Sequence, residues 1–281
     1  MALQIHKSVH KIINRDGRSL WLPASIVGGR VRFGEPNIFA QSSSQIFPVG
    51  TKLEYADGRV FRYGQFLETS TTPPMARLLC NASLVGGSAS TYSYEGTLDA
   101  TSDYAVGSTK LILNDTTDRA ENYYEDAMLA VYPATAYHEY RVAGNEAASS
   151  VDDVTIYLSD PEGLVEALVV NSTGVTIYPS IYRNMAYNDA TGYESAVGMY
   201  LGMTMTATYY AWVQTWGRCI ITPTAYFGDS ANERLAMMWS DSTIATAATA
   251  DPSSGYQIVG YLSQRTVSGY GDLEVMLQLG R

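Results

Sequence analysis

The sequence predicts a mainly β protein, with antiparallel sandwich or barrel domains, an extended N-terminal arm and one short helix. Three observations lead to this prediction. Tyrosine dominates the aromatic residues, with 22 Tyr against 6 Phe and 4 Trp, and tyrosine favours pleated, half-exposed strands. An Asp-Gly pair stands between two alternating runs, which is a strong hairpin signal. Short alternating runs separated by turns then recur to the last residues of the sequence.

The hairpin is expected over residues 51–63, with Asp57-Gly58 in its turn. A two-residue loop would pair Tyr55 with Val60 and would mix apolar with charged side chains on one face. A three-residue loop with Gly58 in the left-handed conformation pairs Leu53 with Phe61 instead. It separates an apolar face from a mainly charged face that also holds Val60: Leu53, Tyr55, Phe61 and Tyr63 on the first, and Lys52, Glu54 and Arg62 on the second. We therefore predict the three-residue loop.

Alternation of apolar and polar residues predicts the other strands. They are expected at residues 109–113, 127–132, 137–142, 154–158, 175–178, 209–216, 256–262 and 273–279. The uncharged stretch 195–217 has the length of a membrane span, but its glycines, threonines and partial alternation indicate buried strands. Residues 240–254 are rich in Ser, Thr and Ala and are expected to form an exposed loop. Two prolines before helix formers predict a short helix at residues 75–80.

Four segments are expected along the chain. Residues 1–46 form a basic N-terminal arm with one or two strands. Residues 47–80 hold the hairpin and the short helix. Residues 81–205 form a central β domain, and residues 206–281 add C-terminal β strands that close the body.

Charge is distributed unevenly along the sequence. Residues 1–34 contain six basic residues and one acid, a net charge of +5, whereas the remainder has a net charge of −15. A basic arm on an acidic body favours docking onto a large partner through the arm. The acidic body is a poor nucleic-acid binder, because phosphate contacts need Lys and Arg. Nucleic-acid binding by the arm alone stays open, but six spread charges are a weak signal, so no nucleic-acid partner is expected. No membrane partner is expected either, and the N-terminus lacks an apolar run of signal-peptide length, which predicts a protein that stays where it is made.

Residues with catalytic or metal-binding chemistry form no recognisable set. Cys80 and Cys219 match no metal or redox spacing and are expected to be buried free thiols. His6 and His10 have no third ligand nearby, and His138 has no nucleophile in a recognisable context. The acidic stretch 115–126 lacks a calcium-loop pattern and is expected to be solvated. We therefore expect no enzyme activity, no cofactor and no bound metal.

Several phrases of the sequence resemble the head-decoration, or capsid cement, proteins of tailed bacteriophages. The first runs from Phe47-Pro-Val-Gly-Thr-Lys52 to Asp57-Gly-Arg-Val-Phe-Arg-Tyr63. The second set is Ala105-Val-Gly-Ser-Thr-Lys-Leu111, Tyr137-His-Glu-Tyr-Arg-Val142 and Val154-Thr-Ile-Tyr-Leu-Ser-Asp-Pro161. The most distinctive is Tyr210-Ala-Trp-Val-Gln-Thr-Trp-Gly217, followed by the closing strands. Together these phrases cover most of the chain from Phe47 onward.

The resemblance implies a structural virion protein on the outside of a phage capsid, made in the host cytoplasm. It would form a homotrimer, bind the major capsid protein between its subunits and reinforce the shell. The expected capsid contacts combine the basic arm with the hairpin: Lys7, Lys11, Arg15, Arg18, Arg30, Arg32 and Arg62. The expected subunit interface is the aromatic phrase of the last block: Tyr209, Tyr210, Trp212 and Trp216.

Two other classes of protein remain open from the sequence. A head-fibre, tail or baseplate component, or a receptor-binding adhesin, could use the same four aromatic residues to stack on sugars. A carbohydrate-active enzyme on a β scaffold would need two facing carboxylates in a cleft. The sequence does not single out such a pair.

Overall fold

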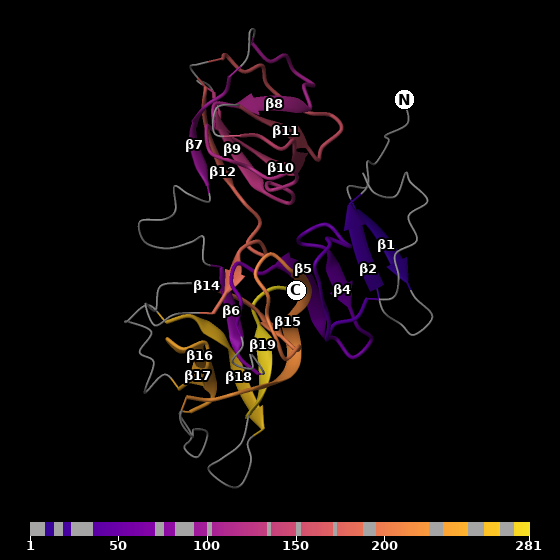
Figure 1. Ribbon diagram of the computed structural model, residues 1–281, viewed down its shortest axis with the longest axis vertical. Helices are drawn as coiled ribbons and strands as arrows, with labels where there is room; N and C mark the ends of the chain where they lie inside the picture. Colours follow the sequence, from indigo (N-terminus) through magenta and orange to yellow (C-terminus); the bar gives the residue numbers. More distant parts are fainter. Residues whose placement is uncertain are drawn as a thin grey trace. The chain divides into compact units, whose positions relative to one another are not determined.

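The computed structural model describes residues 9–13, 19–23, 36–70, 76–81, 93–99, 103–133, 136–149, 153–170, 173–187, 195–224, 233–246, 256–264 and 273–281. Residues 9–13 and 21–23 are described by their backbone alone. Every regular element among these residues is a β-strand, and every pairing between named strands that is described in register is antiparallel (Figure 1). The prediction of a mainly β, antiparallel fold is confirmed.

Residues 93–180 form one compact unit, and most of the other described residues form a second. The first unit is a six-stranded sheet in the order β7-β12-β9-β10-β11-β8. Its strands are β7 (Tyr94–Thr97), β8 (Lys110–Leu113), β9 (Met128–Tyr132), β10 (His138–Asn145), β11 (Val154–Leu158) and β12 (Gly174–Tyr178). The chain after β7 also bridges to the end of β8, through Leu98 and Leu113. The amide of Asp99 donates to the carbonyl of Ile112 at 2.9 Å. The sheet therefore closes on itself into a barrel, which protects its edges.

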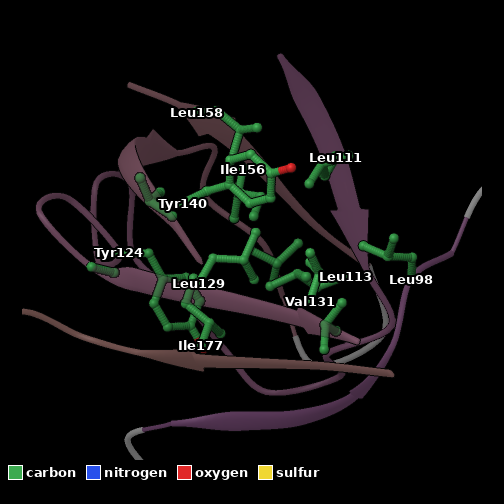
Figure 2. Packing of buried hydrophobic residues seen from close by; sticks show 14 of the residues in the cluster. Leu98, Leu111, Leu113, Tyr124, Leu129, Val131, Tyr140, Ile156, Leu158 and Ile177 are labelled. Carbon is green, nitrogen blue, oxygen red and sulfur yellow. The ribbon is translucent and has the colours of Figure 1, made fainter. Parts of the chain in front are cut away.

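The interior of this barrel is filled by apolar side chains (Figure 2). Along β11, Val154, Ile156 and Leu158 are buried while the residues between them are more exposed, as the alternation predicted. Each neighbouring strand adds its own inward residues, among them Leu113, Leu129, Val131, Tyr140 and Ile177. The barrel is thus a packed scaffold, and recognition by this unit has to use its outer surface.

The second unit is built on a 13-stranded sheet centred on the long strand β15 (Tyr210–Ile221). The main order is β1-β2-β4-β5-β15-β19-β18-β16-β17. Its strands are β1 (Val9–Ile13), β2 (Ser19–Pro23), β4 (Lys52–Glu54), β5 (Val60–Gln65), β16 (Leu235–Met238), β17 (Ile244–Ala245), β18 (Ile258–Gln264) and β19 (Leu273–Gln278). Off this path lie β3 (Gln41–Ser42), β6 (Leu78–Asn81), β13 (Met185–Ala186) and β14 (Ser195–Tyr200).

The hairpin of β4 and β5 has the predicted register. Leu53 lies opposite Phe61 and Lys52 lies opposite Arg62. Gly58 has a φ of +85°, and the amide of Tyr55 donates to the carbonyl of Arg59 at 2.9 Å, so the loop has three residues with a left-handed glycine. Leu53, Phe61 and Tyr63 are buried on the apolar face, which is continuous with a core that includes Trp212.

Three sequence expectations differ from the structure. The prediction of a short helix at residues 75–80 is wrong for the residues that are described, because Leu78–Asn81 form β6, a strand buried on both faces. The loop at residues 240–254 is wrong where it is described: Ser242 and Thr243 are buried, and β17 lies within it. The compact unit of residues 93–180 lies inside the segment 81–205, but β14 belongs to the other sheet, where it pairs with β6 and β15.

Candidate binding surface

The predicted contacts of the basic arm fall largely outside the described side chains. Arg15, Arg18, Arg30 and Arg32 lie outside the described residues, as does Lys7, and Lys11 is described only as part of the backbone of β1. Their role in capsid binding stays a prediction. Within the described part of the arm, the backbone forms strands that join the large sheet, since β2 pairs with β4 from Ser19 to Trp21.

Arg62 is described, and its guanidinium is engaged inside the second unit. Its Nη1 donates to the carbonyl of Gly50 at 3.0 Å and its Nη2 to that of Arg281 at 3.4 Å. Lys52, on the same face of the hairpin, forms an ion pair with Glu54 at 3.2 Å. The charged side chains of this face are therefore bonded within their own chain, and a capsid contact by Arg62 would have to compete with these bonds.

The four aromatic residues expected at a subunit interface lie mostly within the fold of one chain. Trp212 is 2% exposed and packs against Phe47 and Tyr63, with ring centroids 5.1 and 5.2 Å apart. It cannot reach a second copy or a sugar, so its assignment to an interface is wrong. Tyr210 stacks on Tyr63 at 5.9 Å. Tyr209 and Trp216 are half-buried, and Tyr209 packs against an adjoining core cluster.

A different set of large apolar residues, three of them tyrosines, is exposed on the outside of the barrel. Met128, Tyr132, Tyr137 and Tyr178 are each 48–54% exposed. They come from β9, from the residue before β10 and from the end of β12, which are neighbouring strands. We call this surface, together with the exposed Glu95 and Glu139 and the buried Ala130 and Thr176, the tyrosine face.

The register of the four strands orders the tyrosine face in rows. Its middle row runs across the strands through directly paired positions: Glu95 on β7, Thr176 on β12, Ala130 on β9 and Glu139 on β10. Tyr178 and Met128 are paired on one side of this row. Tyr132 and Tyr137 lie on the other side, with ring centroids 5.5 Å apart. A row of small side chains, with a carboxylate at each end, thus lies between two rows of large apolar ones.

Polar contacts hold parts of this face in place. The hydroxyl of Tyr137 donates a hydrogen bond to Oε1 of Glu139. This bond, added to the nearby charge of Glu139 and to the neighbouring phenols of Tyr132 and Tyr178, raises the pKa of Tyr137 to about 12. The phenol of Tyr137 is therefore neutral at pH 7 and remains a hydrogen-bond donor to Glu139. The one cation at the rim, Arg141, is paired with Asp126.

The negative charge of the chain is concentrated in the unit that carries the tyrosine face. Residues 93–180 contain 15 acidic and 3 basic residues, a net charge of −12, while the rest of the chain has 13 acidic and 15 basic residues. The three basic side chains are all engaged: Arg119 with Asp115, Arg141 with Asp126, and Lys110 over the ring of Tyr157. The body is acidic, as the sequence predicts, and its negative charge is concentrated in this unit. The net charge of this unit, −12, is larger in magnitude than the −10 of the whole chain.

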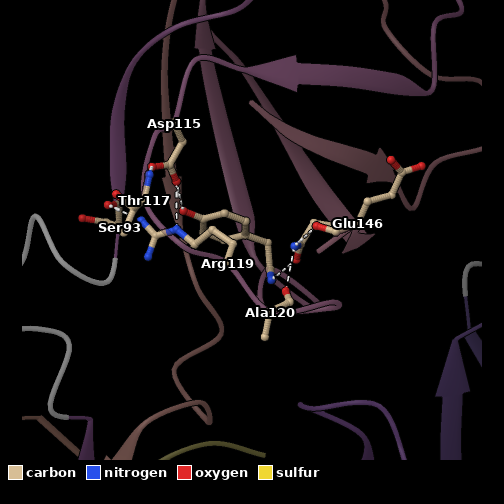
Figure 3. Close-up of polar contacts among 8 residues, drawn as sticks. Ser93, Asp115, Thr117, Arg119, Ala120 and Glu146 are labelled. Atoms are coloured by element: carbon tan, nitrogen blue, oxygen red, sulfur yellow. Dashed lines mark hydrogen bonds and ion pairs between the residues drawn. The ribbon is translucent and has the colours of Figure 1, made fainter. Parts of the chain in front are cut away.

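Asp115 differs from the expectation of a solvated acidic stretch. It is 2% exposed and accepts hydrogen bonds from Nε of Arg119 at 2.8 Å and from the hydroxyl of Tyr124 at 2.9 Å (Figure 3). The Arg119 guanidinium also donates to the carbonyl of Ser93 at 3.3 Å. Desolvation by burial raises the pKa of Tyr124 above its ordinary value, which keeps it a hydrogen-bond donor. An arginine four residues after an aspartate was the sequence signal for this pair.

The sequence reasoning missed the tyrosine face altogether. Its residues come from separate strands and become neighbours only through the sheet register. A usable signal existed in β9 and β12, where Met128, Tyr132 and Tyr178 occupy the outward positions that polar residues normally hold on a half-solvated strand. Exposed apolar residues in a cluster, unlike single ones, indicate an interaction site.

Other kinds of site find little support in the described part of the chain. No group of three or more His, Cys, Asp or Glu residues there is placed to hold a metal ion. Among the same residues, the structure contains no helix with the length and apolar character of a membrane span. Cys80 and Cys219 are both buried thiols that form no disulfide, as predicted.

Comparison with known proteins gave no relative for this chain. No family model, no curated protein and no solved structure matches it.

Proposed function

We propose that this protein is a non-enzymatic structural component of a phage virion, which decorates the outer surface of the capsid by binding between major-capsid subunits. The observation that carries the proposal is the tyrosine face on a barrel whose interior is filled. A filled barrel recognises its partner by surface contact, and tyrosine provides apolar area and a hydroxyl in one side chain, which suits protein interfaces.

The phrases that resemble head-decoration proteins add to this support. Phe47 and the hairpin of residues 51–63 belong to the core around Trp212, so the first and the most distinctive phrases pack together in one unit. A decoration protein strengthens a shell by binding only its assembled state, because a ligand stabilises the state to which it binds. Several weak contacts from one homotrimer would add up through avidity.

A co-sedimentation experiment tests the proposal. The full chain is mixed with expanded capsids of the phage that encodes it, from which the decoration protein has been removed, and in parallel with free major-capsid subunits. We expect saturable binding to the capsids and none to the free subunits. A variant with the six arm residues Lys7, Lys11, Arg15, Arg18, Arg30 and Arg32 replaced by serine should bind the capsids more weakly. Absence of capsid binding, or equal binding to free subunits, would contradict the proposal.

A second candidate is a virion adhesin or fibre component that binds glycans. The tyrosine face favours it, because exposed rings can stack on a sugar while neighbouring carboxylates such as Glu139 accept hydrogen bonds from its hydroxyls. Glycan binding that is lost on Tyr137→Ala and Tyr178→Ala, with the fold intact, would support this candidate over the capsid role.

A further inference from the structure

We propose that the tyrosine face binds the basic N-terminal segment of a second copy of this chain, so that neighbouring molecules are linked arm to barrel. The inference concerns self-association. Its place in a capsid lattice rests on the proposed function, but the contact itself does not.

Charge complementarity is the first argument. The chain carries its charge in two blocks, +5 in residues 1–34 and −12 in residues 93–180, while the remaining residues have a net charge of −3. The basic block has six cationic side chains and one acid. In the acidic block, each of the three cations already has a partner within the same unit. Two such blocks attract each other across an interface and accelerate its formation.

The chemistry of the face is the second argument. The face presents the exposed rings of Tyr132, Tyr137 and Tyr178. The carboxylate of Glu139 lies beside the ring of Tyr137. A lysine or arginine side chain fits such a surface, because its cation binds over an aromatic ring and its donors reach the neighbouring carboxylate. Arg141, the cation at the rim, is neutralised by Asp126 and does not repel such a ligand.

The spacing of the charges is the third argument. Glu95 and Glu139 end the middle row and are separated by three interstrand steps, which is about 14 Å at the usual spacing of paired strands. In an extended chain, residues four positions apart are separated by about 13 Å. Lys7, Lys11 and Arg15 follow one another at intervals of four, and residues 9–13 are extended as β1. In an extended chain, two successive members of this series would therefore have the same spacing as the two carboxylates.

Sedimentation velocity of the full chain, without capsids, tests the contact. We expect the weight-average mass to rise with protein concentration at low salt and to return to that of a single chain at about 0.5 M NaCl, because salt screens the attraction. The double variant Tyr137→Ser/Tyr178→Ser and the triple variant Lys7→Ser/Lys11→Ser/Arg15→Ser should each weaken self-association at least tenfold. The matched control Tyr261→Ser, which changes an exposed tyrosine of the other unit, should associate like the unaltered chain.

Mixing the two variants gives the decisive outcome. The double variant keeps the basic segment and the triple variant keeps the tyrosine face, so a mixture should regain a 1:1 complex that neither variant forms alone. A mixture that stays monomeric, or self-association that survives both sets of substitutions, would overturn the inference. Glu95→Gln/Glu139→Gln repeats the test with smaller changes, and circular dichroism checks that each variant is folded. If the triple variant loses self-association but binds capsids normally, this inference stands and an arm contact with the capsid is contradicted. If it self-associates normally but no longer binds capsids, the arm contact with the capsid is supported and this inference is contradicted.

Discussion

Nε of Arg119 lies 2.8 Å from Oδ2 of Asp115, and both side chains are only 2% exposed, inside a unit that otherwise carries a large excess of negative charge. The pair is completed by the hydroxyl of Tyr124 on the carboxylate and by the rings of Tyr123 and Tyr124 near the guanidinium, at 5.0 and 5.3 Å. The carboxylate of Asp115, the guanidinium of Arg119 and the hydroxyl of Tyr124 are removed from water by burial, and they form hydrogen bonds with one another instead. One of the three cations of the barrel is thus used for its internal structure.

Asp115→Asn should destabilise the barrel by about 3–5 kcal/mol, because it leaves the buried guanidinium of Arg119 without its counter-charge. All four tryptophans lie outside residues 93–180, so tryptophan fluorescence reports the other unit, and circular dichroism reports both. The unfolding transition followed by circular dichroism should begin at a lower urea concentration than in the unaltered chain. The transition followed by tryptophan fluorescence should shift less.

The control for this prediction is Asp118→Asn, which removes the same charge from an exposed side chain three residues away. It should leave both transitions within error of the unaltered chain. Replacing both members of the pair, as in Asp115→Leu/Arg119→Met, should recover much of the lost stability, since no buried charge remains. A double variant as unstable as Asp115→Asn would show that the ion pair itself is not the source of the effect.

The two thiols should be unreactive in the folded protein. Desolvation by burial raises the pKa of Cys219 to about 12, and Cys80 lies with its Sγ 3.2 Å from Sδ of Met238 in the same apolar cluster. The nucleophile in thiol chemistry is the thiolate, which is scarce far below the pKa. Ellman's reagent at pH 8 should therefore detect no thiol before unfolding and two in guanidinium chloride. Rapid reaction of either thiol in buffer would contradict the packing of this cluster.

Strands with one buried and one open face were predictable, whereas the short strand β6, which is buried on both faces, was not. In β11 the alternation from Val154 to Leu158 follows directly from the barrel wall. In β6 all four residues of Leu78–Asn81 are buried, so no period of two exists, and the preceding prolines indicated a helix instead. Ser242 and Thr243 have a loop-like composition, but the amide of Thr243 is held by Asp241 and the segment is packed.

The candidate site shows the same limit. The Asp-Gly turn encodes the hairpin locally, so its register could be derived from one segment. The tyrosine face requires the four strands β7, β9, β10 and β12 to be in register, and such long-range pairing cannot be read from any single stretch of sequence. Trp212 shows the converse, because its place in an aromatic run indicated an interface while the fold around Phe47 and Tyr63 buries it.

The ion pair between Arg218 and Glu274 should make a small, pH-dependent contribution to stability. Hydrogen bonds from Arg218 and from the hydroxyl of Ser263 lower the pKa of Glu274 below its ordinary value of 4.5. A lowered pKa in the folded state contributes stability that is present above the unfolded pKa and is lost as the pH falls through the folded one. Glu274→Gln should lower the melting temperature at pH 7, and the difference from the unaltered chain should shrink below about pH 4. A difference that grows on acidification would contradict this assignment.

Two glycines near the hairpin should differ in what an added methyl group costs. Gly58 has a φ of +85° and open space around the position of a Cβ, so Gly58→Ala should cost about 1 kcal/mol from backbone strain alone. Gly217, in β15, has a φ of +96°, and a Cβ there would lie 3.0 Å from Cα of Arg59 in the hairpin turn. Gly217→Ala adds this contact to the strain and should cost about 1 kcal/mol or more in addition.

Urea unfolding followed by tryptophan fluorescence measures both, since Trp212 and Trp216 lie in β15. Gly58→Asn should be milder than Gly58→Ala, because asparagine tolerates the left-handed region. An equal cost for alanine at the two glycines would mean that the turn can move away from β15.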